Sequence, residues 1–283
     1  MPGSYQIRPL DRSEIRTALD WAAREGWNPG HQDAACFGSV DPEGFRGGFL
    51  DGQMIACISV VNYGATFSFL GFYIVAPAYR GQGYGYALWQ KALAHAGDRT
   101  VGLDGVVDQQ DNYRRSGFEL ACRNIRFGGV PAEKHLARGG FDLLPLTEPP
   151  PDLQALDARI FPAPRPVFWQ HWLAAAGHVS FAAFRDGALA GFGTLRPCGS
   201  GCKIGPLAAV SRPAAEAVLA RLLQELPDGQ KIFLDVPEPH AQAVDLARSL
   251  GLAPVFETAR MYRGAAPQLE TDLIYGVTSF ELG

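Results

Sequence analysis

The chain has 283 residues, of which 47% are hydrophobic and 19% are charged. Such a composition is ordinary for a soluble globular protein, and the length suits two domains better than one. The formal net charge is −4 and there is no lysine- or arginine-rich run, so charge gives no reason to expect nucleic acid or an anionic membrane as a partner. No apolar stretch approaches a membrane span and the first residues lack a signal-peptide core, so we expect a cytoplasmic protein; the sequence leaves the oligomeric state open.

The five cysteines are scattered, and their odd number does not suit a disulfide framework. Cys198 and Cys202 flank Gly-Ser-Gly at a predicted hairpin tip, but no second pair of cysteines or histidines accompanies them, as a zinc site would need. The histidines show no ligand spacing either. We therefore predict no metal site.

The first quarter of the chain predicts a strand, two helices and a hairpin. Asp11 or Ser13 is placed to cap the first helix. Asp51-Gly52 between two apolar runs is a strong hairpin signal. The expected elements are a strand at 5–10, a helix at about 12–25, a break at 27–30, a short helix at 33–37 and strands at 45–50 and 54–62.

The stretch from Phe69 to Gly97 predicts a strand, a glycine-rich turn and a helix. Aromatic and branched residues suit a buried strand as far as Val75, Pro77 ends it, and apolar residues then recur at helical spacing. The turn, Arg80-Gly-Gln-Gly-Tyr-Gly85, has three glycines within five residues, which allow positive φ angles and leave several N–H groups free at a helix N-terminus. A loop of this kind binds phosphate.

The spacing of this loop distinguishes it from other phosphate loops. A Walker loop requires Gly-Lys-Ser/Thr, and a dinucleotide loop requires glycine where Tyr86 stands. The loop instead matches R-x-x-G-x-G after a strand that ends in Val-Ala-Pro. This pattern resembles the coenzyme A pyrophosphate loop of the GNAT N-acetyltransferase superfamily. The resemblance implies that coenzyme A is bound by Ile74, Val75, Ala76, Arg80, Gly81, Gln82, Gly83, Tyr84 and Gly85.

A second motif follows a predicted strand at 100–103 and a polar segment at 104–111, and precedes a strand at 120–127. Tyr113-Arg-Arg-Ser-Gly-Phe118 resembles the Y-x-x-x-G-F end of the superfamily's final helix, whose tyrosine hydroxyl lies near the coenzyme sulfur. A phenol of pKa ~10 can protonate a leaving thiolate whose thiol has a pKa of ~8.5, so Tyr113 is the candidate general acid. The superfamily's asparagine seven residues earlier is replaced by Val106, and Asn112 is the candidate substitute for that coenzyme contact.

The landmarks of the first half recur in the second half. A glycine- and proline-rich stretch from 128 to 151 predicts a linker with one strand inside it, and we place the domain boundary between residues 134 and 135. The matching pairs are Tyr5 and Phe141, Asp51 and Asp186, Gly71 and Gly205, and Gly117 and Gly251, with offsets of 136, 135, 134 and 134. Such a steady shift indicates a duplicated domain, so residues 1–134 and 135–283 resemble a tandem GNAT pair.

The two copies differ in the residues that carry chemistry. Where the second copy should have its phosphate loop it reads Ser211-Arg-Pro-Ala-Ala-Glu216, whose side chains would block close approach of a ligand to the backbone. Ala247 stands four residues before Gly251, where the first copy has its tyrosine. We expect the second copy to be degenerate, with a structural or substrate-defining role.

The resemblance implies an α/β (α+β) fold in which each copy is a mixed, mostly antiparallel sheet with two splayed central strands and helices on both faces. The splay would let the coenzyme's pantetheine arm pair with the strand edge near Val75, and a backbone N–H there would polarise the thioester carbonyl. The reaction expected is direct transfer of an acetyl group from acetyl-CoA to a primary amine, because no cysteine or serine is placed as a nucleophile.

The acceptor side of the site is less defined by sequence. Asp33, His31 and Asp104 are alternative proton acceptors, as is a chain of waters, and no one of them is favoured. The superfamily builds its acceptor pocket from the first two helices, so the candidate lining residues are Trp27, Asn28, Asp33, Phe37 and Asp104. Amino acids, polyamines, aminoglycosides and peptides all present the same amine, so the acceptor stays open.

Three alternatives remain. The protein could be a coenzyme-A-binding sensor without turnover, against which the tyrosine at catalytic spacing argues. It could be a scaffold, against which the intact glycine loop argues. It could also transfer a longer acyl chain, since the same loop would serve.

Overall fold

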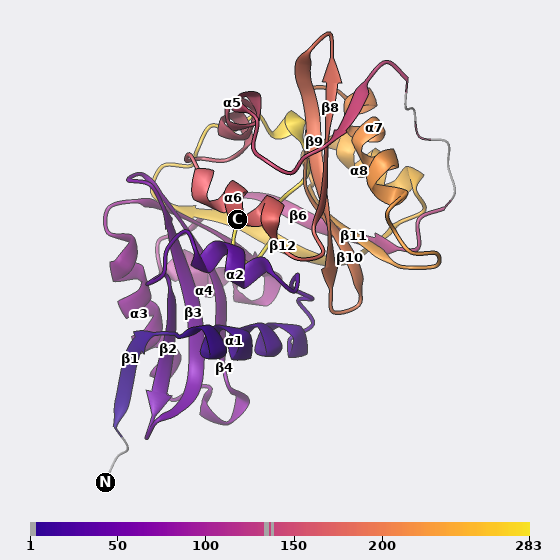
Figure 1. The fold of residues 1–283 in the computed structure, drawn as a ribbon. Helices are drawn as coiled ribbons and strands as arrows, with labels where there is room; N and C mark the ends of the chain where they lie inside the picture. The colour runs from indigo at the N-terminus through magenta and orange to yellow at the C-terminus, as the bar shows by residue number, and fades with distance from the viewer. Residues whose placement is uncertain (1–3, 133–135, 137–138) are drawn as a thin grey trace.

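The fold is described by a computed structural model that covers residues 4–132, 136 and 139–283 (Figure 1). The first half contains β1 (Tyr5–Pro9), α1 (Arg12–Arg24), α2 (Asp33–Gly38), β2 (Phe45–Leu50), β3 (Gln53–Tyr63), β4 (Phe67–Val75), α3 (Tyr84–Ala96), β5 (Thr100–Val106), α4 (Gln110–Arg115) and β6 (Glu119–Gly129). The second half contains β7 (Asp142–Pro145), α5 (Pro151–Ile160), α6 (Pro166–Ala174), β8 (Val179–Arg185), β9 (Ala188–Cys198), β10 (Gly201–Ala209), α7 (Arg212–Leu223), β11 (Ile232–Pro237), α8 (Ala241–Ser249), β12 (Ala253–Arg263) and β13 (Ile274–Gly276).

Local signals in the sequence account for several element ends. The Asp11 side chain accepts hydrogen bonds from the amides of Ser13 and Glu14, and the Asp11 amide donates one to the Glu14 carboxylate, which completes a capping box at the start of α1. Asp51 and Gly52 have φ angles of 49° and 83°, so both central residues of the β2–β3 turn are left-handed, as the hairpin signal predicted.

The order of elements repeats from one half to the other. β3 and β9 both have 11 residues, β4 and β10 both have nine, and β6 and β12 both have 11. The duplication expected from the sequence therefore appears as two copies of one strand and helix order. The predicted boundary between residues 134 and 135 lies outside the described residues.

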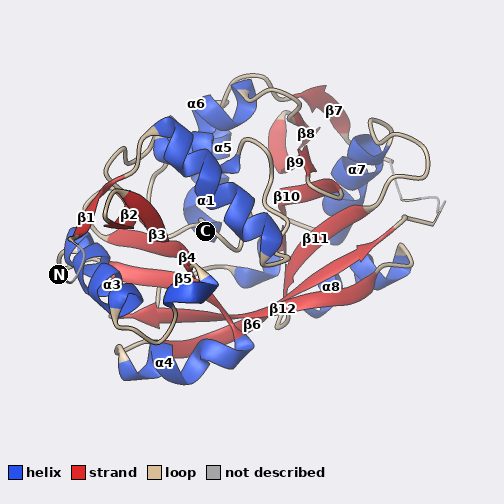
Figure 2. Ribbon diagram, turned by 90° about the horizontal axis from the view of Figure 1, so that it is seen from below, coloured by secondary structure: helices blue, strands red, loops and turns tan. Residues whose placement is uncertain are grey.

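All the strands of the described residues join one sheet, in the order β1-β2-β3-β4-β5-β12-β6-β11-β10-β9-β8-β7, with β13 added on β10. The two halves exchange a strand. β12 of the second half pairs with β5 of the first half, and β6 of the first half pairs with β11 of the second half. Figure 2 shows these two long strands running side by side across the middle of the molecule. The predicted mixed, mostly antiparallel sheet with helices is confirmed, and the two halves share it as one continuous sheet with exchanged strands.

The exchange also corrects the predicted end of β5. The sequence placed it at residue 103, but the strand continues to Val106 because Asp104, Gly105 and Val106 pair with Arg260, Ala259 and Thr258 of β12. Local composition could not show this pairing, since the partner strand lies more than 150 residues away in the chain.

Three apolar cores hold the sheet and its helices. One lies under α1 and α2 and continues to α5 and α6, so it joins the halves; in it, the rings of Phe37 and Phe168 lie 5.1 Å apart. A second contains the inner faces of α7 and α8. The third, around Trp89 of α3, lies on the other face of the first half. No helix among the described residues is long and apolar enough to cross a membrane.

Candidate active site

The glycine loop begins where β4 ends. The 3₁₀ turn Pro77–Tyr79 leads into it, Gly81 and Gly83 have φ angles of 75° and 86°, and Gly83 is the N-cap of α3. A Cβ at Gly81 or Gly83 would meet nothing within 4 Å, so the loop's outer side is open. Within the part of the chain that the structure describes, none of the amides of residues 81–86 donates a hydrogen bond. The loop therefore has the open backbone N–H groups of an anion site at the start of a 13-residue helix.

Side chains brace this loop from beneath. Arg80 donates from Nε to the carbonyl of Val75 at 2.8 Å and from a terminal nitrogen to Glu25 at 2.6 Å. A Cβ at Gly85 would lie 2.6 Å from Cγ2 of Val75, so this glycine allows α3 to pack closely on β4. Gln82 donates to the carbonyl of Ala78. Arg80 and Gln82 thus hold the loop's shape in this structure.

The two central strands of the first half diverge beside the loop. β4 and β5 pair in parallel only from Phe67 with Thr100 to Leu70 with Leu103. Beyond that point β4 bulges: Ser59 pairs with Gly71 but Cys57 with Ile74, and Phe72 has a φ of 49°. The amide of Ala76 donates to Ile55 of β3. Because amides alternate in direction along a strand, the Val75 N–H faces the open side that β5 has left. The expected splay is confirmed.

Two cavities meet at this splay. One, of about 730 Å³, lies between α3 and α4, and its lining includes Trp89 and Asn112. The other, of about 40 Å³, lies on the side of Trp27 and Phe72. Tyr73 and Tyr113 line both. We call the space around these two shared side chains the passage; the wide cavity lies on one side of it and the narrow cavity on the other.

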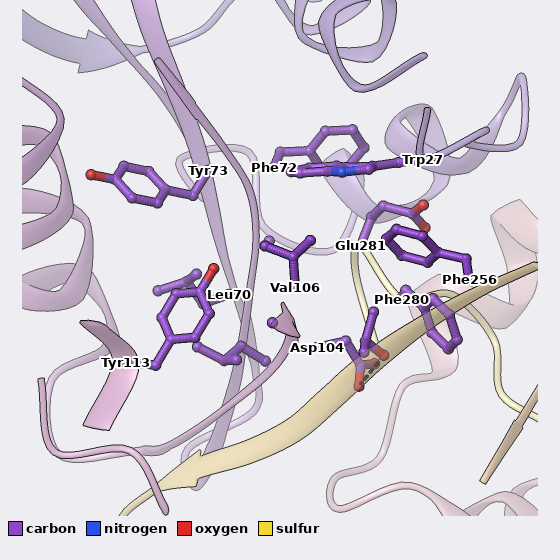
Figure 3. A pocket seen from close by; sticks show the side chains of 14 residues that line it. Trp27, Leu70, Phe72, Tyr73, Asp104, Val106, Tyr113, Phe256, Phe280 and Glu281 are labelled. Atoms are coloured by element: carbon purple, nitrogen blue, oxygen red, sulfur yellow. Dashed lines mark hydrogen bonds between the residues drawn. The ribbon is translucent and has the colours of Figure 1, made fainter. Parts of the chain in front are cut away.

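Tyr113 lies at the junction, on α4. Its ring stacks on Trp89 with centroids 5.8 Å apart and covers Gly105, where a Cβ would lie 2.3 Å from the ring. In Figure 3 its hydroxyl points into the passage. Burial, with a smaller contribution from Tyr73, raises the pKa of Tyr113 to about 12. The phenol is therefore protonated over the whole physiological range and is a weak acid.

Tyr73 has a different orientation. Its hydroxyl approaches α3, because a Cβ at Gly85 would lie 2.7 Å from it, and Figure 3 shows it pointing away from the narrow cavity. Burial raises the pKa of Tyr73 as well. Of the two phenols, Tyr113 is the one directed at the junction.

Two of the predicted acceptor residues line the narrow cavity. Trp27 forms part of its wall. Asp104 also lines this cavity, but its side chain is 0% exposed. Arg260 donates hydrogen bonds to both of its carboxylate oxygens, at 3.0 and 2.6 Å, and Asn124 donates to one of them at 2.7 Å. Burial raises the pKa of Asp104, while Arg260 opposes this. Asp104 is thus placed at the site, with both oxygens committed to hydrogen bonds.

The other candidates do not line either cavity. Asn28 bonds Cys198 and the amide of Ser200 on the β9–β10 hairpin. Phe37 is in the core between α2 and α6. Asp33 is buried against Arg196, whose Nε donates to it at 2.8 Å. Burial by itself would raise the pKa of Asp33, but the neighbouring Arg196 guanidinium holds that pKa below its usual range. The backbone amide of His31 donates a hydrogen bond to the carbonyl of Pro197 on β9. These residues contact the second half of the chain.

The narrow cavity has further walls that sequence reasoning missed: Phe256 and Thr258 of β12, and Phe280 and Glu281 of the C-terminal segment. A Cβ at Gly71 would lie 1.6 Å from the Glu281 carbonyl oxygen, so this segment packs directly on the β4 bulge. No local motif marks these residues, because only tertiary contacts bring β12 and the C-terminal segment to the first half.

Arg126 of β6 holds these walls together. Its guanidinium pairs with both oxygens of Asp235, at 2.6 and 2.7 Å, and donates to the carbonyl of Trp27. It also lies 4.8 Å from the ring centre of Phe280 and 5.7 Å from that of Phe256. One buried side chain therefore contacts two of the cavity's aromatic rings and the backbone of Trp27.

In the second half the corresponding splay is filled by the chain itself. β10 and β11 pair in parallel only from Cys202 to Ile204, and β13 pairs with β10 beyond that point. The Val277 amide donates to the carbonyl of Asp235 on β11. A Cβ at Gly205 would lie 2.4 Å from the Val277 carbonyl oxygen.

A helix-capping loop with free amides, an open strand edge and a buried phenol beside two cavities are the features expected of an acyl-CoA-dependent acyltransferase. Family comparisons agree: residues 12–118 match the acetyltransferase (GNAT) family, and residues 153–276 match an acetyltransferase (GNAT) domain. A holothin acyltransferase from Pseudoalteromonas sp. (strain SANK 73390) is 30% identical over 280 residues, which is 99% of this chain and 95% of that protein. The chain belongs to the GNAT acetyltransferase family and has two GNAT domains in tandem.

Solved structures show the same fold over nearly the whole chain. A Pyrococcus horikoshii protein assigned to the acetyltransferases superposes with a TM-score of 0.82 at 19% identity, over 99% of this chain and 96% of that one. A tandem GNAT protein from the clavulanic acid biosynthesis pathway gives 0.61 at 16% identity, over 93% and 100%. At sequence identities of 19% and 16%, these similarities show a common fold only.

Proposed function

We propose that the N-terminal half, residues 1–134, binds acetyl-CoA and transfers its acetyl group to a primary amine by direct attack. The observation that carries this is the combination of an open glycine loop at the start of α3, an unpaired edge of β4, and Tyr113 of α4, which together with Tyr73 of β4 lines both cavities. The coenzyme enters from the wide α3–α4 side and the amine from the narrow side.

The coenzyme's contacts follow from the backbone. Its pyrophosphate lies on the amides of residues 81–86, where the positive end of the α3 dipole adds to their attraction. The pantetheine arm follows the open edge of β4, with Asn112 on the opposite wall. The Val75 N–H then donates to the thioester carbonyl oxygen and stabilises the negative charge that develops on it.

The narrow cavity supports acetyl as the acyl group. A volume of about 40 Å³ is room for roughly three water-sized groups, since one needs about 10–15 Å³ of such volume. An acetyl group and an attacking nitrogen fit that space. A long acyl chain would have to displace the aromatic walls that Arg126 contacts.

The second half is proposed to bind no coenzyme. β13 already occupies the strand edge that pantetheine would use, and the loop from Ser211 to Arg212 opens α7 with side-chain contacts in place of glycines: Ser211 caps Ala214, and Arg212 pairs with Glu216 and Asp245. Its role is to complete the acceptor cavity through β12 and the C-terminal segment.

The acceptor is proposed to be a small molecule. The relative from Pseudoalteromonas is named for the acylation of holothin, and the chain matches it over nearly its full length.

Calorimetric titration and thiol release test this function together. Acetyl-CoA should bind at one site per chain, and a library of small primary amines should contain acceptors that release free coenzyme A. Two coenzymes per chain would refute the assignment of the halves. Tight binding with no turnover of any amine would favour a coenzyme sensor, and no binding at all would favour a scaffold.

A further inference from the structure

The narrow cavity is lined by groups that attract a cation. Six aromatic rings form much of its wall, and they belong to Trp27, Phe72, Tyr73, Tyr113, Phe256 and Phe280. The face of an aromatic ring carries partial negative charge, so several rings around one small space stabilise an ammonium group. Two of these rings already pack against a cation, because the Arg126 guanidinium lies 4.8 Å from the ring centre of Phe280 and 5.7 Å from that of Phe256.

Two carboxylates also line this cavity, and one of them has an oxygen to spare. Asp104 forms a neutral pair with Arg260, which binds both of its oxygens, and Asn124 donates to one of them. Glu281 differs: its Oε2 atom accepts from Ser279, but its buried Oε1 atom accepts no hydrogen bond from the described residues. Figure 3 shows Glu281 among the residues around the cavity. Because buried carboxylate oxygens are normally hydrogen-bonded, Oε1 is suited to a donor that the substrate brings.

The cations nearest to Glu281 do not use this capacity. Arg126 of β6 comes no closer to Oε1 than 3.9 Å, and it already binds both oxygens of Asp235 on β11. Nζ of Lys203 on β10 lies 3.5 Å from Oε1 but makes no hydrogen bond with the described part of the chain. Burial, together with the charge of Arg126, lowers the pKa of Lys203. The charged form of Lys203 is therefore disfavoured, which leaves Glu281 with charge for a second cation to neutralise.

The size of the cavity limits the amine to a slim one. Its volume of about 40 Å³ is room for roughly three water-sized groups. The acetyl group takes most of this volume, so the remaining space suits a nitrogen without a ring or a branch beside it. The nitrogen must therefore end an unbranched carbon chain that extends out of the cavity.

Resting on the proposed function, we infer that the acceptor is an unbranched aliphatic primary amine that enters as its ammonium ion, and that Glu281 binds this ion and takes one proton from it. Burial of an ammonium beside a carboxylate favours this proton transfer, because a neutral pair is less costly to bury than a charged one. The second half of the chain thus supplies the group that recognises the amine.

The proton taken by Glu281 frees the nitrogen lone pair. The nitrogen attacks the thioester carbon, and the carbon–sulfur bond breaks. The thiolate takes the Tyr113 proton, and the resulting phenolate takes the proton that the acylated nitrogen loses. The products are the amide and free coenzyme A, Tyr113 ends protonated, and the proton on Glu281 passes to solvent as the amide leaves.

The first test uses the full-length protein with acetyl-CoA and two amines of similar basicity, n-butylamine and cyclohexylamine. Thiol release gives kcat/KM from pH 6 to 8. n-Butylamine should be favoured at least tenfold, because cyclohexylamine is branched at the carbon that bears the nitrogen. Its kcat/KM should be nearly independent of pH, because an amine of pKa ~10.4 is about 99.6% ammonium ion even at pH 8. A rise of about tenfold per pH unit would show that only neutral amine is used. That result, or a preference for cyclohexylamine, would overturn the inference.

Variants link the pH profile to Glu281. Glu281→Gln removes the charge and keeps the size of the side chain, so kcat/KM for n-butylamine should fall at least tenfold at pH 7.5. It should then rise about tenfold per pH unit, because only the neutral amine reacts. Glu257→Gln is the matched control, because Glu257 is 43% exposed beside Arg123 and lines neither cavity. Lys203→Met should keep the parent's flat profile, which separates titration of this lysine from titration of the substrate.

Calorimetric titration with acetyl-CoA shows which variants are folded. A flat profile in Glu281→Gln, or equal losses in Glu281→Gln and Glu257→Gln, would contradict the role of Glu281. If Glu281→Gln fails to bind acetyl-CoA, Glu281→Asp decides: it keeps the charge one carbon further back, so kcat/KM should fall several-fold with the profile still flat, and an unaltered kcat/KM would count against the contact. If no amine of any class releases thiol, the proposed function itself fails.

Discussion

Replacing Tyr113 with phenylalanine tests the mechanism most directly, because it removes a proton donor and keeps the ring. The ring stacks on Trp89 and covers Gly105, contacts that phenylalanine also makes. Coenzyme binding and folding should therefore be unchanged. We expect kcat to fall by about 10²-fold, at the lower end of the usual range for general acid catalysis of roughly 10²–10⁴.

The magnitude follows from the burial of the phenol. A pKa of about 12 places Tyr113 roughly 3.5 units above a thiol of pKa ~8.5, so the transfer is uphill by ~4.8 kcal/mol. A turnover of 10 per second corresponds to a barrier of about 16 kcal/mol, so this step is accessible. The donor is nonetheless weak, and its loss should cost about 2.7 kcal/mol of transition-state stabilisation, which is 10² in rate.

The assay is thiol release under saturating acetyl-CoA and amine, with binding measured by calorimetry. An ordinary phenol predicts a decline in rate near pH 10. Because the phenol must be protonated to donate and burial raises its pKa to about 12, the parent enzyme should show no decline up to about pH 10.5. Tyr73→Phe is the control, since Tyr73 lines the same cavities with its hydroxyl turned toward α3. A Tyr113→Phe enzyme within threefold of the parent kcat, or a larger loss in Tyr73→Phe, would refute the reasoning.

Two further predictions concern coenzyme binding and stability. Gly83→Val places a branched side chain at the open N-cap of α3, where φ is 86°. It should lower coenzyme A affinity, measured by calorimetry, at least tenfold, which is ~1.4 kcal/mol. Unchanged affinity would mean that the loop is not the coenzyme site. Arg196→Met leaves Asp33 buried without its counter-charge and should cost about 3–5 kcal/mol in urea unfolding at pH 7, whereas a cost below about 1 kcal/mol would contradict the structural role of the pair. In the parent protein the pKa of Asp33 is lower in the folded state than in the unfolded state. The stabilisation from the Asp33–Arg196 pair is therefore complete above the unfolded pKa of about 4 and is lost as the pH falls through the folded pKa.

The sequence by itself determined those parts of the protein that depend on near neighbours in the chain. The glycine loop is set by residues within five positions of one another, and the β2–β3 turn by two adjacent residues. The duplication could also be predicted, because matching residues in the two halves are separated by a nearly constant number of positions. The conformation of the glycine loop could therefore be predicted from local sequence, including its positive φ angles at Gly81 and Gly83.

Tertiary structure decided the acceptor side. The C-terminal segment packs on β4 and brings Phe280 and Glu281 to a cavity of the first half. Strand exchange places β12 beside β5 and brings Phe256 to the same cavity. It also provides Arg260 to bind Asp104, which sequence alone left as a possible base. Asp33 and Phe37 kept a site-like pattern but belong to the contact between halves. The physical reason is that burial and ion pairing depend on which distant strands meet, and no short-range pattern in the chain encodes the partner of an edge strand.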